Sequence, residues 1–438
     1  DYRSSRGLGD VYKRQRLAWI ILIREYNLSM DYVAYAVPFF LLLIVLELGY
    51  GFLIKKNNYR ISDTLTSLSL GSISQYVPIL KLGFQGAVFA FIADYFSLPL
   101  LSSSSWIVWV VAFILYDLCY YWFHRMHHEV KIFWASHVVH HHGEEFNLST
   151  ALRQTSSGFL WSWIFYIPLF VLGIPPEVFI TVGSLNLIYQ FWVHTEHVKT
   201  IGIFEYILVT PSNHRVHHAQ NEEYIDANYG GVFIFWDIIF GTFIEEKKEV
   251  KPIYGTVKPL NSWNPIKANI DVYWLILRDS FVTKRWGDKF KVWFSDARWR
   301  PDDVSERFPV QRNDLSSFVK YDPKLDVLQK IYAFFQIFSL IIIPNFIVSD
   351  LDQQTYFQSL ILIGNAVLFI TFTLMYLEGK QYALWMESIR SISFIALIFF
   401  DFSELSLLSV QISGIHALVC LLYLVIALPL RIVKFQSA

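Results

Sequence analysis

Long uninterrupted apolar stretches constrain this chain more than any other feature of its sequence. A membrane-spanning helix needs about 20 apolar residues. Stretches near that length cover residues 32–54, 77–98, 106–123, 327–348, 356–377, 383–400 and 405–430, and two more flank Gly173-Ile174-Pro175-Pro176 within residues 160–193. With 54% hydrophobic residues, the composition suits lipid better than water. The sequence therefore predicts an all-α, multi-pass integral membrane protein in which residues 160–193 form a helical hairpin.

Charged residues are distributed unequally between the ends of these stretches. Lys55 and Lys56 follow the first stretch, while the turn at residues 102–105 carries no charge. Because basic residues stay on the cytoplasmic side, we expect the first turn inside and the second outside. Further residues that fit this orientation are Asp350, Asp352, Asp401 and Glu404 outside, with Arg431 and Lys434 inside. The chain around His124 and His194 is then expected on the cytoplasmic side.

Composition divides the chain into four expected parts. Residues 1–29 include a run, Asp10 to Gln15, that resembles a translated sequencing adapter, so we expect a non-native or disordered leader with translation starting at Met30. Residues 30–246 are expected to form a membrane-embedded catalytic domain, residues 247–326 a cytoplasmic segment, and residues 327–438 C-terminal transmembrane helices. The cytoplasmic segment is expected to contain an amphipathic helix that lies on the membrane or on the catalytic domain, with an apolar face of Ile266, Ile270, Trp274 and Leu277.

Twelve of the thirteen histidines lie between His124 and His218. They form four groups: His124, His127 and His128; His137, His140, His141 and His142; His194 and His197; His214, His217 and His218. Residues three or four apart share one face of a helix, so each larger group can direct several imidazoles at one centre. The groups lie at the ends of apolar stretches, which is not typical of a loose metal-buffering loop. His416 stands alone and is interpreted as an ordinary hydrogen-bonded residue.

Imidazole clusters of this size predict a metal centre. Neutral imidazole binds iron, zinc, copper or nickel rather than magnesium or calcium. A single zinc ion takes only three or four protein ligands, so two metal ions that share an oxygen species explain the pattern better. The chain has only Cys119 and Cys420, both within apolar stretches, which excludes a disulfide framework or a zinc finger. Its 36 basic and 37 acidic residues nearly balance and predict no nucleic-acid partner.

Acidic residues next to the histidines are candidates for orienting them. Ligating imidazoles commonly donate their second N–H to a carboxylate, which fixes the tautomer. Glu129 shares a helix with His124 and His128 and is the favoured candidate for a functional acid. Glu144, Glu145 and Glu196 also flank histidine groups, and each of these acids could instead be a solvated loop residue.

Several motifs resemble those of one known superfamily. They are YWFHR at 121–125, NLSTALRQ at 147–154, QFWVHTE at 190–196, TPSNHRVHH at 210–218, NYGG at 228–231 and FGTF at 240–243. These motifs are similar to those of the fatty acid hydroxylase and sterol desaturase superfamily, and within it to the alkylglycerol monooxygenase family with its bacterial relatives. The likeness extends over most of the chain after Met30.

The resemblance implies a di-iron, O2-dependent membrane monooxygenase. The ligands carried over from its histidine boxes are His124, His128, His137, His140, His141, His194, His214, His217 and His218. His197, His127 and His142 stay open. The resemblance also implies a lipid substrate from the bilayer, an external electron donor, with tetrahydrobiopterin as the family's reductant, and cleavage of alkylglycerol ether lipids. The short loops favour a bacterial cytoplasmic membrane over the endoplasmic reticulum.

Two other functions remain open at this stage. A sterol, fatty acid or carotenoid hydroxylase or desaturase would carry the same histidine boxes, since substrate choice depends on the shape of the substrate tunnel. Phe146, Phe159, Trp161 and Trp163 could line such a tunnel or could face lipid as an aromatic belt. A metal transporter would place histidines along the spans at mid-bilayer depth, whereas here they gather at the ends of the spans.

Overall fold

The computed structural model describes residues 32–81, 88–89, 91–92, 95–96, 98–350, 353–400 and 407–436. Within these residues the secondary structure is helical, and extended pairing is limited to isolated bridges between Val130 and Asp296 and between Ala219 and Tyr254. The all-α prediction is confirmed. The predicted leader, much of the stretch at 77–98, and Asp352, Asp401 and Glu404 lie outside the described residues.

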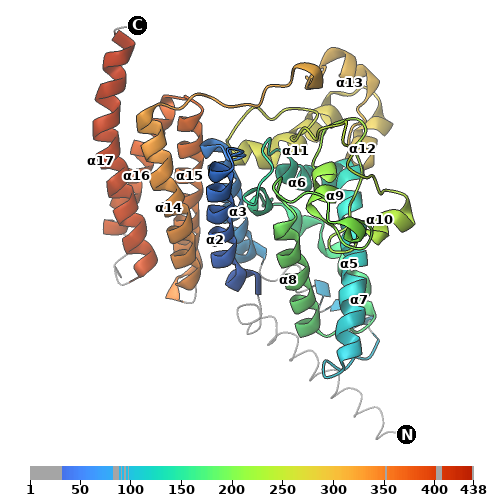
Figure 1. Ribbon diagram of the computed structural model, residues 1–438. Helices are drawn as coiled ribbons and strands as arrows, with labels where there is room; N and C mark the ends of the chain where they lie inside the picture. Colours follow the sequence, from blue (N-terminus) through green and yellow to red (C-terminus); the bar gives the residue numbers. More distant parts are fainter. Residues whose placement is uncertain are drawn as a thin grey trace, which may run out of the picture.

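Six described helices are long and apolar enough to span a membrane. They are α2 (Tyr32–Leu53), α5 (Trp106–Glu129), α14 (Val327–Ser349), α15 (Tyr356–Leu377), α16 (Tyr382–Phe400) and α17 (Leu408–Gln436) (Figure 1). Each corresponds to a predicted apolar stretch, so the protein is an integral membrane protein. The predicted hairpin is present as α7 (Trp163–Val171) and α8 (Pro176–Trp192), separated at Gly173, whose φ of +75° favours glycine. These two helices have only 9 and 17 residues.

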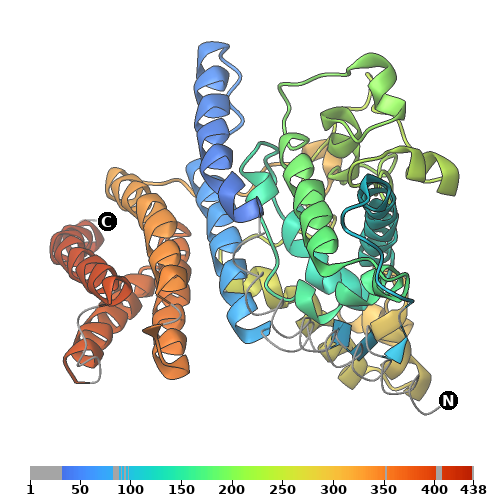
Figure 2. The same ribbon diagram turned by 90° about the horizontal axis from the view of Figure 1, so that it is seen from below.

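Helix α3 (Ile61–Lys81) lies between two halves of the molecule. On one side it packs against α14 and α15 of the C-terminal bundle, and on the other it contacts the short helix η1 (Thr150–Leu152) of the histidine-bearing half. Seen from below, α14–α17 form one side of the molecule and α5, α7 and α8 lie on the other (Figure 2). Helix α3 therefore links the C-terminal bundle to the segment that follows the second histidine group.

A cap of shorter helices lies at one end of the long helices, at the top of Figure 1. Its helices are α6 (Lys131–His141), α9 (Pro211–His217), α10 (Phe235–Phe240), α11 (Pro265–Val282), α12 (Trp286–Phe294) and α13 (Asp302–Arg307). The remaining short helices are η2 (Gly158–Leu160), η3 (Gly202–Tyr206) and η4 (Leu315–Ser317). Helix α6 carries the second histidine group, so the cap holds much of the candidate site.

The predicted amphipathic helix exists as α11, but the face that packs on the cap differs from the predicted one. Ala268, Val272 and Ile276 are buried and pack with the apolar side of α6. The predicted face is exposed instead, with Trp274 65% accessible. A second set of apolar residues at intervals of four gave α11 two apolar faces, and the sequence pattern alone did not separate them.

Gly71 sets the distance between α3 and η1. A β-carbon built on Gly71 would collide with the carbonyl oxygen of Leu152, which directly precedes Arg153. We predict that Gly71→Ala lowers the free energy of unfolding by about 1–3 kcal/mol, because the backbone of η1 must move. Gly364→Ala on α15 is the matched control, since nothing lies within 4 Å of the added β-carbon, and it should be neutral or stabilising by up to about 1 kcal/mol. Thermal unfolding in detergent measures both changes, and equal melting temperatures would contradict this account.

Candidate metal centre

Nine histidines gather into two adjoining groups. The first group is His124, His128, His137, His141 and His217, and the second is His140, His194, His214 and His218. Within each group the candidate ligand nitrogens all lie within 4.8 Å of one another. Seven of these side chains are buried, and His137 and His140 are half-buried. The structure therefore brings together all nine histidines that the sequence comparison with the family had singled out.

Helical spacing explains how the groups form. His124 and His128 lie one turn apart on α5, as do His137 and His141 on α6. The pair His214 and His218 has the same spacing at α9. Each such pair contributes both members to one group, because residues four apart share a helix face.

The neighbouring residues His140 and His141 belong to different groups, and so do His217 and His218. The rings of His141 and His218 stack with centroids 4.4 Å apart, so the two groups are in direct contact through these two side chains. From their spacing, the histidines of residues 137–142 were expected to point at one centre, whereas the structure sends His140 to the second group. The nine candidate ligands could be named from the family resemblance, but their division into groups of five and four depends on where the folded chain brings α6 and the end of α9 together.

Backbone carbonyls fix the tautomers of four of these imidazoles. Nδ1–H groups donate to carbonyl oxygens at 2.8–3.1 Å in the pairs His124–Tyr229, His140–Arg153, His194–Gln190 and His217–Ala227. A carbonyl oxygen can only accept, so Nδ1 holds the proton and Nε2 of each neutral ring is a bare lone pair. The four Nε2 atoms are therefore available as metal ligands.

The bare nitrogens face one another at distances that need a cation. Nε2 of His140 lies 3.2 Å from Nε2 of His194, although both rings carry their proton on Nδ1. Two lone pairs at this distance repel, and a shared positive ion removes the repulsion. Nε2 of His217 is buried without a hydrogen-bond partner. The donor set therefore fits transition-metal ions, and all of its members are imidazoles.

Burial also keeps these rings neutral. Desolvation lowers the pKa of His140 to about 4 and that of His217 to about 3. It lowers the pKa values of His141, His214 and His218 well below the usual 6.5, and neighbouring imidazoles add to the effect. At neutral pH these side chains present lone pairs rather than charges, which is the state a metal requires.

Charged residues outside the two groups hold the histidine segments in place. The guanidinium of Arg153 is 1% exposed and donates to the carbonyl of Val139, directly before His140. Arg215 donates to the carbonyls of Thr195 and Val198 and pairs with Glu246 at 2.7 Å. These contacts fix the segment after His194 against α9.

The loop that orients His124 depends on a buried carboxylate. Asp237 accepts from the backbone N–H groups of Tyr229 and Gly230, and the Tyr229 carbonyl holds His124. Sequence reasoning assigned no individual role to Arg153, Arg215 or Asp237. Arg153 and Arg215 do stand within the family motifs at 147–154 and 210–218, which was the available signal.

The acids named from the sequence have other partners in the structure. Glu129 accepts from Arg125 of its own helix at 2.9 Å, and its functional role stays a prediction. Glu144 accepts from the backbone N–H of Tyr321, and Glu145 pairs with Arg60 at 2.6 Å. Backbone carbonyls thus take the second imidazole N–H that carboxylates were expected to accept.

The remaining histidines lie outside both groups. His127 donates to the carbonyl of Phe123 and packs on its ring, and His197 lies edge-on to Tyr50. His142 is buried and directly follows His141 of the first group in sequence. His416 hydrogen-bonds Gln336 at 3.0 Å, which confirms its interpretation as a hydrogen-bonded residue.

The aromatic residues proposed for a tunnel are divided by the structure. Phe146 is 1% exposed and stacks on His194, with centroids 5.6 Å apart, so it forms a wall of the candidate centre. Trp161 packs on Phe133 beside His127, and Phe159 and Trp163 are half-buried.

Comparisons with known proteins agree with this geometry. Residues 109–242 match the family model described as fatty acid hydroxylase. The human alkylglycerol monooxygenase is 37% identical over 372 residues, which is 84% of this chain and 82% of that protein. An ornithine lipid hydroxylase from Rhizobium tropici is 28% identical over 31% of this chain and 41% of its own, and human lathosterol oxidase is 25% identical over 31% and 45%. No solved structure is significantly similar.

The lowered pKa values predict an unusual pH dependence of metal retention. Protons compete for His140 and His217 only near pH 4 and 3, so bound metal should be retained almost unchanged between pH 8 and 6 and lost only as the pH falls below about 5. A hexahistidine tag, with ordinary pKa values near 6.5, is the control and should release metal from about pH 6.5 downward. Metal analysis after dialysis over this pH range measures both, and a loss parallel to that of the tag would contradict the burial argument.

Proposed function

Because this chain belongs to the alkylglycerol monooxygenase family, we propose that it is a di-iron, O2-dependent membrane monooxygenase that cleaves the ether bond of alkylglycerol lipids. The carbon next to the ether oxygen is hydroxylated, and the resulting hemiacetal collapses to an aldehyde and glycerol. One oxygen atom enters the lipid and the other leaves as water, which requires two electrons and two protons from an external donor. Tetrahydrobiopterin is the donor that the family suggests.

The observation that carries the proposal is the crowding of bare imidazole nitrogens in two adjoining groups. Five and four imidazoles supply more ligands than one ion takes, which supports two ions. Iron bound there would supply the oxidising power that removes a hydrogen from an unactivated C–H bond. Imidazoles suit this role because they are not readily oxidised, unlike thiolates.

The protein's own residues orient the ligands and exclude water. Carbonyls of residues 153, 190, 227 and 229 hold Nδ1 protons and so aim each Nε2 at the centre. Phe146 covers one side of the second group. We propose that the ether lipid reaches the centre laterally from the bilayer, with the cap on the cytoplasmic side of a bacterial inner membrane.

A sterol or acyl-chain hydroxylase is the second candidate. The similarity to lathosterol oxidase and to the ornithine lipid hydroxylase supports it, but covers only 31% of this chain in each case. The similarity to alkylglycerol monooxygenase covers 84% of this chain. We therefore give ether lipid cleavage precedence. We set the transporter aside because the nine histidines gather in two adjoining groups, at α6 and α9 and near the ends of α5 and α8, rather than along the spans.

Aldehyde release tests the proposed function. Membranes that contain the protein should release fatty aldehyde from an alkylglycerol under oxygen, and only when tetrahydrobiopterin is added. His140→Ala should abolish release, by at least about 100-fold, and lower the iron content, because the second group loses one of its four imidazoles. Capture of the aldehyde as a hydrazone provides the measurement.

His416→Gln is the control in the same assay, since the amide can keep a hydrogen bond to Gln336 and the residue lies outside both groups. It should keep its iron and its activity. Aldehyde formation by His140→Ala at the unmutated rate would contradict the proposed ligand set. Iron-loaded protein that hydroxylates a sterol but no alkylglycerol would favour the second candidate.

A further inference from the structure

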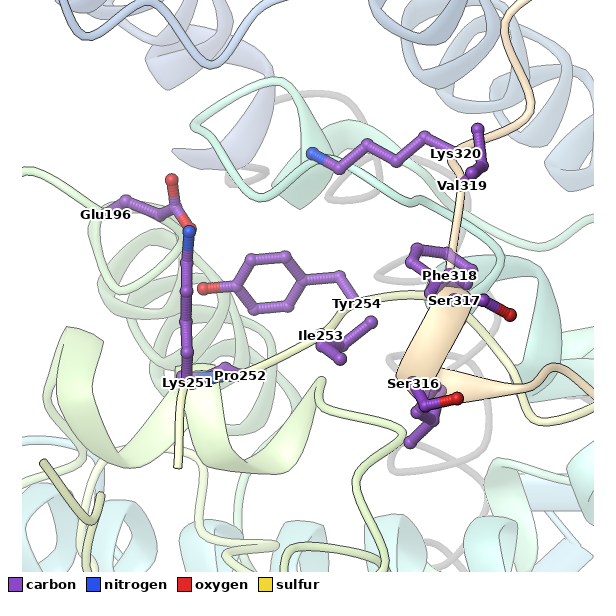
Figure 3. Close-up of a pocket in the computed structure, with 11 residues that line it drawn as sticks. Glu196, Lys251, Pro252, Ile253, Tyr254, Ser316, Ser317, Phe318, Val319 and Lys320 are labelled. Atoms are coloured by element: carbon purple, nitrogen blue, oxygen red, sulfur yellow. The ribbon is translucent and has the colours of Figure 1, made fainter. Parts of the chain in front are cut away.

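A water-facing cleft lies beside the second histidine group. Its volume is about 500 Å3, and it is bounded on one side by residues 251–254 and Glu196 and on the other by residues 315–320 (Figure 3). Clefts of this size commonly bind small molecules. The candidate ligands of the metal centre are themselves mostly buried, so a water-soluble electron donor must act from outside them.

An aromatic pair connects this cleft to the imidazoles. Tyr254 lines the cleft and stacks on Phe146 almost in parallel, with ring centroids 4.9 Å and planes 17° apart. Phe146 in turn lies 5.6 Å from the ring of His194 and 5.2 Å from that of His218. Only two rings therefore separate the cleft from ligands of the second group.

Hydrogen bonds attach both walls of the cleft to the residues that directly follow His218. Tyr254 forms a β-bridge with Ala219, the residue after His218, and the carbonyl of Tyr254 accepts from the Gln220 amide at 2.9 Å. Asn313, just before the opposite wall, donates to Gln220 Oε1 at 2.9 Å. The same Gln220 side chain thus bonds both walls.

The far end of the second wall is also attached close to the histidines. Lys320 pairs with Glu145, and the next backbone N–H donates to Glu144. These two acids follow His142 closely in the sequence, and their side chains bond the wall of the cleft rather than the imidazoles.

The lining suits a planar nitrogen heterocycle with a polar edge. Tyr254 and Phe318 offer aromatic surface, while Lys251, Lys320 and Glu196 provide charged hydrogen-bonding groups. The hydroxyl of Tyr254 points towards Glu196 and Lys251 (Figure 3). When a phenol near a carboxylate gives up an electron, its proton can move to the carboxylate, and it returns when the phenol is reduced again.

We propose that this cleft binds the reduced heterocycle that supplies electrons to the metal centre, with Tyr254 and Phe146 as the route. The proposal rests on the oxygenase function proposed above. The bound heterocycle is oxidised by two electrons and loses two protons. These electrons and protons balance the insertion of one oxygen atom of O2 into the C–H bond and the release of the other as water. A reduced pterin and a reduced flavin share the required chemistry.

Binding to metal-free protein tests the cleft independently of activity. Tetrahydrobiopterin and reduced FMN are the two probes, used in anaerobic equilibrium dialysis with the full chain in detergent. Lys251→Glu and Val319→Trp, at exposed cleft positions, should each weaken binding of the true donor class at least 10-fold. Lys248→Glu is the matched control, because Lys248 is an exposed lysine of the same segment outside the cleft, and it should leave binding unchanged.

The route is tested by anaerobic reduction of the oxidised, iron-loaded protein. Tyr254→Phe keeps the stacked ring but removes the phenol, so reduction by the bound probe should slow at least 10-fold while probe binding changes less than 2-fold. Dithionite, which needs no cleft, should reduce Tyr254→Phe and the unmutated protein equally fast.

The outcomes separate this proposal from the proposed function. Binding of neither probe, or equal binding in both cleft variants, would overturn the cleft assignment even if the protein is an active oxygenase. An unchanged reduction rate in Tyr254→Phe would overturn the route. Probe binding that the cleft variants weaken, in a chain that takes up no iron, would support the cleft while rejecting the di-iron function.

Discussion

The hydrogen bonds from imidazole Nδ1 to backbone carbonyls are the interaction on which the rest of the site depends. Each of these bonds leaves an Nε2 bare. The bare Nε2 atoms of His140 and His194 lie only 3.2 Å apart. Such an arrangement is repulsive by itself and is stabilised by a cation. Because the acceptors are main-chain atoms, the orientation of the rings is built into the backbone at residues 153, 190, 227 and 229, of which residue 190 lies in helix α8.

Three of these carbonyls lie 4 to 13 residues from the histidine that they hold, and the carbonyl of Tyr229 reaches His124 from a distant segment. Helices α5, α6 and α9 present pairs of histidines four residues apart, and the loop held by Asp237 returns a carbonyl to His124. The buried guanidinium groups of Arg153 and Arg215 lie outside the two histidine groups. They donate to the carbonyls of Val139 and Thr195, which are the residues next to His140 and His194. The C-terminal bundle contributes through α3, which packs on both α14 and η1.

Much of this arrangement could be predicted from the sequence. Apolar length alone gave the six candidate spans, and the i, i+4 spacing gave pairs such as His124 and His128. The sequence did not indicate that His140 and His141 belong to different groups, since that depends on where the folded chain places His217 and His218 relative to α6. From the sequence, the carboxylate of Glu129 was the favoured acceptor for an imidazole N–H, whereas main-chain carbonyls such as that of Arg153 accept these bonds. The positions of main-chain carbonyls follow from the folded path of the backbone and leave no mark in the residue types. The cleft beside Tyr254 joins segments 55 or more residues apart along the chain and had no local signal.

The central claim is that two iron ions occupy the two histidine groups. X-ray absorption at the iron edge, combined with metal analysis of protein expressed with iron, tests it directly. The account predicts two irons per chain in a shell of nitrogen and oxygen ligands without sulfur, and a lower content on loss of either His140 or His124, which belong to different groups. A single metal ion per chain, or two zinc ions with no iron under iron-replete expression, would contradict it.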